Sequence, residues 1–212
     1  MLLDISPRIH PGIAVWPGDT PFTRVVNLAI ASGANIDLSE IHGTVHLGAH
    51  TDAPSHYVAG GVAIDARPLD YYIGECLVVA VTVARGARIM PADLPQDFPL
   101  HLPGRILFHT GTYPDPDVFN RDFASLSPEL IALCHDRGAV LMGIDTPSID
   151  PEDSKDLPSH AAIAARDMAI LEGVVLEHVT PGRYELIALP LKIAGADASP
   201  VRAVLRTIPE SP

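Results

Sequence analysis

Three histidines and one aspartate lie within the eleven residues from His46 to His56, although the whole chain of 212 residues has only ten histidines. His50 and Asp52 are two residues apart, so on an extended chain their side chains leave the same face about 6.6 Å apart at Cα, within reach of one cation. A single histidine is more often a structural or surface residue, but four such groups in one short segment favour a metal site. We therefore expect the fold to be organised around this segment.

His46 can join the same site only if the chain bends. On a straight strand it would lie about 13 Å from His50, near the limit for two imidazoles that share a metal at about 2.1 Å from each nitrogen. Gly48 lies at the midpoint and tolerates the backbone angles of a bend. Pro54 cannot donate a hydrogen bond to a neighbouring strand, so we expect it to end the extended segment and leave His56 on a turn. The segment therefore predicts three metal ligands and one histidine held off the metal.

The composition is typical of a soluble globular protein with a sizeable core, since 47% of the residues are apolar and 19% are charged. A formal charge of −12 argues against nucleic acid and anionic membranes as partners, because neither attracts an acidic surface. The longest apolar stretch is too short to span a bilayer, and the N-terminus lacks the pattern of a signal peptide. Cys76 and Cys134 have no CxxC spacing, which indicates neither a disulfide framework nor a thiolate zinc site. We expect a cytoplasmic protein.

Apolar and alternating runs predict β-strands at residues 3–6, 22–30, 35–41, 76–84, 105–110 and 139–144. Residues 32–34 would connect the second and third strands as a hairpin. Ser127 before Pro128 is a good helix start and Gly138 is a matching stop, so a helix would cross between two parallel strands. An early hairpin and a late crossover imply the α/β class. We expect a single domain over residues 1–212, with a mixed, partly closed β-sheet and a few helices packed on its outside.

The segment from Ser159 to Glu172 leaves two conformations open. Its alanine-rich first half, with Ser159 as a cap, favours a helix that begins at His160. A continuous helix to Glu172 would hold the two residues about 18 Å apart, so that they could share no site. A helix that ends near Asp167, followed by an extended stretch, would return Glu172 towards His160.

Trp16 is the only tryptophan of the chain and lies in a proline-rich loop at residues 7–21. It could be an ordinary hydrophobic plug. A flat ring held by prolines could also stack on a planar substrate with little ordering cost, as one wall of a binding site.

Several motifs spread over the chain resemble those of the cyclase family of metal-dependent amidohydrolases, and within it the kynurenine formamidases. They are HxGAHTDAPxH at residues 46–56, VWPGD at 15–19, GIDTPSID at 143–150, ILEG at 170–173, LPLK at 189–192 and DASPVR at 197–202. The resemblance extends over essentially the whole chain, and the first motif is the most specific.

The resemblance implies a centre of two divalent metal ions, with zinc as the first choice and manganese as the second. His46, His50 and Asp52 would bind one ion and His160 the other, with Asp52 and Glu172 as bridging carboxylates. It also favours the conformation in which Glu172 returns to His160. Five candidate ligands suit two ions that share carboxylates, because a single catalytic zinc usually takes three protein ligands.

The resemblance further implies that His56 is the acid/base, that Trp16 is a wall for an aromatic substrate, and that the protein is a homodimer. The expected reaction is hydrolysis of N-formyl-L-kynurenine to L-kynurenine and formate. Thr51 departs from the cysteine of the most similar formamidases, which leaves isatin or another cyclic aryl amide open as the substrate. A non-catalytic protein with a structural metal is a third alternative, although structural zinc sites are usually closed by four ligands and rich in cysteine.

Overall fold

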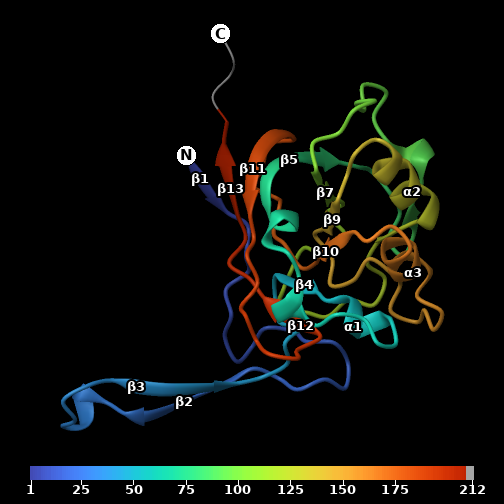
Figure 1. Cartoon of the computed structure of the whole chain (residues 1–212). Helices are drawn as coiled ribbons and strands as arrows, with labels where there is room; N and C mark the ends of the chain where they lie inside the picture. The colour runs from blue at the N-terminus through green and yellow to red at the C-terminus, as the bar shows by residue number, and fades with distance from the viewer. Residues whose placement is uncertain (209–212) are drawn as a thin grey trace.

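A seven-stranded mixed sheet forms the centre of the computed structural model, which describes residues 1–208 (Figure 1). In spatial order the strands are β1 (Leu2–Asp4), β13 (Val204–Thr207), β11 (Gly182–Ile187), β5 (Ile73–Ala80), β7 (Arg105–His109), β9 (Leu141–Ile144) and β10 (Ala169–Leu171). The first four pair antiparallel, and β5, β7, β9 and β10 pair parallel. This arrangement confirms the predicted α/β class and mixed sheet.

The crossover from β7 to β9 runs through helix α2 (Pro128–Asp136). Ser127 caps this helix, since its hydroxyl accepts a hydrogen bond from the backbone N–H of Leu130 at 3.1 Å. The chain leaves the helix through Gly138 at a φ of 107°, a backbone conformation that favours glycine. The buried face of α2 and helix α3 (Pro158–Ala164) cover one side of the parallel strands, as Figure 1 shows. The start, the stop and the crossover predicted from the sequence are thus confirmed.

The two edges of the sheet approach each other, so the sheet is partly closed. After β10, the backbone of Glu172 exchanges two hydrogen bonds with that of His50, at 2.9 and 3.0 Å. Three residues later, the N–H of Val175 donates to the carbonyl of Ile5, which follows β1, at 2.8 Å. This closure lays strand β4 (His50–Asp52) against the end of β10.

Shorter elements complete the described chain. They are strand β12 (Ala198–Pro200), which pairs antiparallel with β4, the parallel pair β6 (Arg88–Ile89) and β8 (Ser125–Leu126), the one-turn helix α1 (Pro54–Tyr57), and the 3-10 helices η1 (Ile30–Ser32), η2 (Ile64–Ala66), η3 (Leu69–Tyr71) and η4 (Pro91–Asp93). Within residues 1–208, every helix is too short to be a membrane span.

Strands β2 (Thr23–Leu28) and β3 (Leu38–His42) form the predicted hairpin, which extends away from the rest of the molecule (Figure 1). Its base is anchored by the buried side chain of Phe22, which packs with Ile13 and Leu47. All residues of the hairpin beyond this base are exposed or half-buried.

Two local predictions were wrong. Ser159 is not the cap of α3, because the helix already begins at Pro158, and Ser159 is buried inside its first turn. The capping oxygens come from Asp150, whose carboxylate accepts hydrogen bonds from the backbone N–H groups of Ser159 and His160 at 3.0 Å each. Pro54 follows the end of the extended segment as predicted, but the expected turn at His56 was wrong, because residues 54–57 form the one-turn helix α1.

The open question about residues 160–172 is also settled. Helix α3 ends at Ala164, and the chain then passes Asp167 at a φ of 47° into β10. Glu172 therefore returns to the sheet edge beside β4 rather than continuing a helix away from it.

Candidate metal centre

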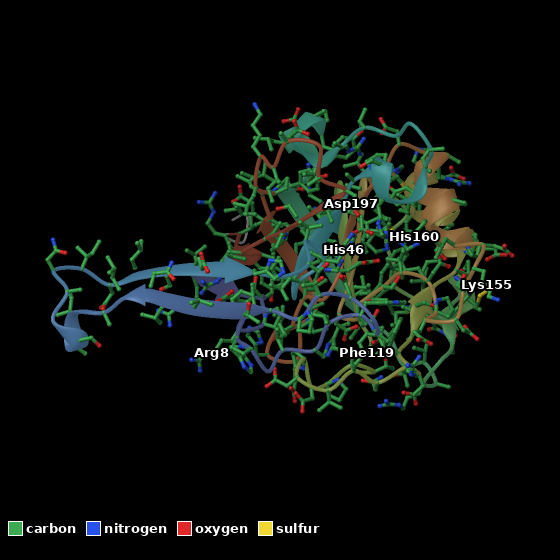
Figure 2. All side chains as sticks on the ribbon, turned by 90° about the horizontal axis from the view of Figure 1, so that it is seen from below. Arg8, His46, Phe119, Lys155, His160 and Asp197 are labelled. Carbon is green, nitrogen blue, oxygen red and sulfur yellow. The ribbon has the colours of Figure 1, made fainter. Side chains whose placement is uncertain are left out.

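Three separate parts of the chain deliver imidazoles and carboxylates to one point. Strand β4 supplies His50 and Asp52, and Gly48 just before it has a φ of 59°, which produces the predicted bend towards His46. His160 comes from the first turn of α3, and Glu172 follows β10 directly. Figure 2 shows His46 and His160 close together within the body of the molecule.

Asp52 occupies the middle of this cluster and is only 2% exposed. Its Oδ1 lies 3.1 Å from His46 Nδ1 and 3.5 Å from His50 Nε2, and its Oδ2 lies 3.5 Å from His160 Nε2. Within residues 1–208, however, no group donates a hydrogen bond of acceptable geometry to Oδ1. A buried carboxylate oxygen is costly to leave unpaired, so this atom suits a bound cation.

Glu172 connects the two sides of the cluster. Its Oε2 lies 3.2 Å from His50 Nε2, and its Oε1 lies 3.9 Å from His160 Nε2. The backbone N–H of Ile149 donates to Oε1 at 2.7 Å and fixes the carboxylate. The structure thus brings together all five side chains expected as metal ligands.

The candidate ligand atoms form two groups that share Asp52. His50, Asp52 and Glu172 offer atoms within 4.8 Å of one another, and so do His46, Asp52 and His56. A shared carboxylate is compatible with two neighbouring ions, because its two oxygens can each face one ion. His56 is therefore close enough to be a ligand, and its assignment as the acid/base stays a prediction.

Two further aspartates orient the imidazoles, and the sequence interpretation had named neither as a site residue. Asp150 Oδ2 lies 2.8 Å from His160 Nδ1, and Arg88 Nη2 holds the other oxygen of Asp150 at 2.8 Å. Pairing with Nδ1 leaves Nε2 of His160 directed at the cluster, as is usual for metal-binding histidines. The only signal in the sequence was that Asp150 ends the GIDTPSID motif.

Asp197 joins His46 and His56 from the opposite side. Its Oδ2 lies 3.1 Å from His46 Nε2 and 3.2 Å from His56 Nδ1, and the two imidazole rings are 4.2 Å apart. Figure 2 shows Asp197 beside His46. Asp197 begins the DASPVR motif, and the antiparallel pairing of β12 with β4 brings it to the site.

The carboxylates control the charge state of the imidazoles. Burial lowers the pKa of His46, but Asp52 outweighs this effect and raises it to about 9. Burial likewise lowers the pKa of His160, and Asp150 and Asp52 raise it to about 10. Burial raises the pKa of Asp52, whereas the imidazoles of His160 and His46 hold it well below its usual range. Protonated imidazoles therefore balance the carboxylates at neutral pH when no cation is bound, and metal binding must release protons.

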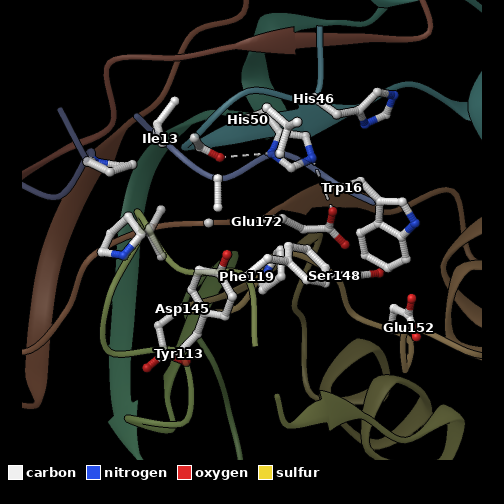
Figure 3. A pocket seen from close by; sticks show the side chains of 18 of the residues that line it. Ile13, Trp16, His46, His50, Tyr113, Phe119, Asp145, Ser148, Glu152 and Glu172 are labelled. Atoms are coloured by element: carbon white, nitrogen blue, oxygen red, sulfur yellow. Dashed lines mark hydrogen bonds and ion pairs between the residues drawn. The ribbon is translucent and has the colours of Figure 1, made fainter. Parts of the chain in front are cut away.

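The cluster lies in the wall of a cavity of about 700 Å³. Trp16 lines this cavity as predicted, together with Tyr113 and Phe119, which the sequence analysis did not name as site residues. The ring of Phe119 stands edge-on to Trp16 at 5.5 Å and to Tyr113 at 6.1 Å. Figure 3 shows these aromatic side chains around the same space as His50 and Glu172.

Asp145, on the opposite side of the cavity, holds the loop that leads to Tyr113. Its carboxylate accepts hydrogen bonds from the N–H groups of Thr110 and Gly111, each at 2.8 Å, and from the hydroxyl of Thr110 at 2.7 Å. Burial raises the pKa of Asp145 despite these hydrogen bonds. Its role is therefore to position the aromatic wall.

Two other motif residues point away from the cavity. The hydroxyl of Thr51 donates to the carbonyl of Ile170 at 2.6 Å and connects β4 to β10. The side chain at position 51, which is threonine here and cysteine in the most similar formamidases, therefore lies behind the site and does not face the cavity. Arg202 pairs with Asp4 on the surface.

Comparisons with known proteins agree with this geometry. The model of the cyclase family matches residues 3–151. A solved structure described as a potential metal-dependent hydrolase with cyclase activity is 28% identical, covers 99% of both chains and superimposes with a TM-score of 0.82. A predicted metal-dependent hydrolase from Bacillus stearothermophilus is 27% identical over 97% of both chains, with a TM-score of 0.80. Isatin hydrolase A from Labrenzia aggregata, bound to benzyl benzoate, shares the fold at 21% identity, with coverage of 97% and 93% and a TM-score of 0.77.

Proposed function

This chain belongs to the cyclase family, and we propose that it is a metal-dependent amidohydrolase that converts N-formyl-L-kynurenine to L-kynurenine and formate. One observation carries the proposal. A buried oxygen of Asp52 that accepts no hydrogen bond of acceptable geometry in the described chain lies among three imidazoles, beside a cavity with aromatic walls. Such a site combines cation ligands with a surface for a planar substrate.

The donor set suits two divalent ions, with zinc as the first candidate and manganese as the second. His46, His50 and Asp52 would hold one ion and His160 the other, with Asp52 and Glu172 shared between them. When bound, such ions lower the pKa of water towards 7 and polarise a carbonyl oxygen. Asp150 supports this arrangement, because it keeps Nε2 of His160 available to an ion.

We assign the role of acid/base to His56, and its contact with Asp197 supports this assignment. Its Nδ1 faces Asp197, so its Nε2 can accept the proton of the attacking water and return it to the aniline nitrogen as the amide C–N bond breaks. The hydroxyl of the water remains on the formyl carbon, which leaves as formate. An imidazole suits both transfers, because one ring nitrogen can accept a proton and later donate it.

The aromatic walls suit the aryl ring of the substrate. Trp16 and Phe119 come from loops far apart in the sequence, and their edge-to-face contact fixes both rings before a ligand arrives. The cavity of about 700 Å³ is in the range that holds a small ligand and buries most of its surface.

Isatin or another cyclic aryl amide is the second candidate substrate. Among the described residues that line the cavity, none is lysine or arginine, so no fixed cation faces the carboxylate of an amino-acid substrate. A neutral ring such as isatin needs no such partner. The solved isatin hydrolase that shares this fold is the reason for naming isatin as the second candidate substrate.

A direct comparison of the two substrates tests the proposal. The purified protein would be stripped with a chelator, reloaded with Zn²⁺ or Mn²⁺, and assayed for kynurenine from N-formyl-L-kynurenine and for isatinate from isatin. We expect at least a tenfold higher kcat/KM for N-formyl-L-kynurenine. The reverse preference would establish the second candidate, and a metal-loaded protein inactive on both would contradict the proposal and favour a structural metal.

A further inference from the structure

Ser148 lies in the wall of the cavity but belongs neither to the metal cluster nor to the aromatic wall. It is only 7% exposed and lines the same cavity as Glu172 and Trp16. Figure 3 shows its side chain at the edge of the space that these two residues face. A buried hydroxyl normally has hydrogen-bond partners, so the partners of this one indicate what it can do.

The hydroxyl of Ser148 has one protein partner and one donor group left over. Its Oγ accepts a hydrogen bond from the backbone N–H of Asp150 at 3.2 Å. Among residues 1–208, no oxygen or nitrogen accepts a hydrogen bond from it. A hydroxyl can donate one hydrogen bond while it accepts another, so the O–H is available to a molecule in the cavity.

The two residues after Ser148 are both bonded to the metal cluster. The backbone N–H of Ile149 donates to Glu172 Oε1 at 2.7 Å. Asp150 Oδ2 lies 2.8 Å from His160 Nδ1. The available O–H therefore lies on a segment that is held beside two of the candidate metal ligands.

Both candidate substrates carry a second carbonyl beside the amide. In N-formyl-L-kynurenine a ketone is attached to the ring carbon next to the one that bears the amide nitrogen, and isatin has the same ortho arrangement within its second ring. An amide carbonyl that faces the metal centre therefore brings the ortho carbonyl close to it as well. A carbonyl oxygen is costly to leave without a donor when it is removed from water.

The other hydroxyls of the cavity wall are less suited to this acceptor. Among the described lining residues they belong to Tyr113 and Ser154, and both residues are only half-buried. Tyr113 follows the loop that Asp145 holds on the opposite side of the cavity. In the described part of the lining, only Ser148 combines a buried hydroxyl with neighbours that are bonded to the metal cluster.

We propose that Ser148 is a specificity-determining residue, whose O–H donates a hydrogen bond to a carbonyl ortho to the amide nitrogen of the substrate. The inference rests on the proposed function as an aryl-amide hydrolase, and it holds for either candidate substrate. The contact fixes the rotation of the aromatic ring in the cavity. The protein therefore selects aryl amides with an ortho carbonyl over isomers that carry the carbonyl elsewhere on the ring.

Two isomeric substrates test this contact. The ortho-acetyl and para-acetyl derivatives of formanilide carry the same electron-withdrawing group, but only the first places it beside the amide. For the metal-loaded wild-type protein we expect at least a tenfold higher kcat/KM for the ortho isomer. In Ser148→Ala this ratio should fall at least fivefold, because the ortho carbonyl loses its donor.

Ser125→Ala is the matched control. Ser125 is fully buried in β8, outside the cavity lining, and its hydroxyl has no hydrogen-bond partner among the described residues. The ratio of the two kcat/KM values should change less than twofold in this variant. Circular dichroism would verify that both variants are folded.

Binding of the amine products tests the same contact without turnover. By titration calorimetry, the wild-type protein should bind ortho-aminoacetophenone more tightly than the para isomer, and Ser148→Ala should lose this preference. That result in a protein inactive on both formamides would support the contact and contradict only the proposed function. No ortho preference of the wild-type protein in either assay, or a preference that Ser148→Ala keeps, would overturn the proposal. An equal loss of kcat/KM for both isomers, with weaker metal binding, would show that Ser148 only supports Asp150 and would overturn it too.

Discussion

Residues 23–43 and residues 46–56 follow each other in the chain, yet the first segment holds aliphatic side chains in solvent and the second holds the ionisable side chains of His50 and Asp52 in the interior. Ile41 is 73% exposed, whereas Asp52 is 2% exposed. Folded proteins usually show the opposite pattern, because removal from water stabilises apolar groups and destabilises unpaired charged groups. Buried charges are usually paired or bind a metal ion, and exposed apolar groups that lie together often mark a contact surface.

Removal of the Asp52 carboxylate should have the largest effect on the buried cluster. In Asp52→Ala, both groups of ligand atoms lose their shared member, so we expect loss of bound metal and a drop in turnover of at least about 10³-fold. Metal analysis and kinetics on the purified variant measure both effects. An Asp52→Ala protein that is active without metal would rule out the proposed mechanism.

The variant His56→Ala tests whether His56 transfers protons or binds a metal ion. If His56 only transfers protons, the variant keeps its metal content and loses about 10²–10⁴-fold in kcat. The surface residue His10, which pairs with Asp117, supplies the control His10→Ala with unchanged kcat. Metal loss in His56→Ala would instead show that the group of His46, Asp52 and His56 is a ligand set.

Asp150→Asn should weaken the metal centre without removing a ligand. An amide of the same size cannot accept all the hydrogen bonds that the carboxylate receives from α3 and from His160 Nδ1. We expect about 10–100-fold weaker metal affinity, measured by titration calorimetry. The exposed Asp156, changed to Asn, is the control. Equal affinity of the two variants would refute a positioning role for Asp150.

The stability of the metal-free protein should fall as the pH rises. The pKa of His46 is raised from 6.5 to about 9 in the folded state, so its contribution is complete below about pH 6.5 and is lost as the pH passes about 9. His160 acts in the same direction, with a pKa of about 10. Added metal should reverse the trend, because it binds neutral imidazoles. Thermal unfolding at pH 6, 8 and 10 measures the effect, and a chelated protein more stable at pH 10 than at pH 6 would contradict it.

Thr51→Cys should have the smallest effect. The hydroxyl of Thr51 donates to Ile170 behind the site, so its replacement should cost about 1 kcal/mol of stability. We expect the ratio of kcat/KM for N-formyl-L-kynurenine to that for isatin to change less than twofold. A larger change in this ratio would show that position 51 influences the cavity.

Much of the local structure was predictable because it depends on a few neighbouring residues. The cap at Ser127, the bend at Gly48 and the hairpin all follow from side-chain and backbone preferences within one turn or one strand pair. The predicted cap of α3, Ser159, was wrong because its basis was local. Its capping carboxylate, Asp150, lies nine residues before Ser159, outside the range of any local signal.

The sequence by itself determined part of the candidate metal centre: the two-residue spacing of His50 and Asp52 places their side chains within reach of one cation, and Gly48 permits the bend that adds His46. Only the tertiary structure decided that Glu172 faces His50, that Asp197 joins His46 to His56, and that Tyr113 and Phe119 stand beside Trp16. The reason is physical. Local preferences act over a few residues, whereas these contacts arise when the sheet closes on itself, when β12 pairs with β4 and when distant loops pack together, which joins segments up to about 150 residues apart.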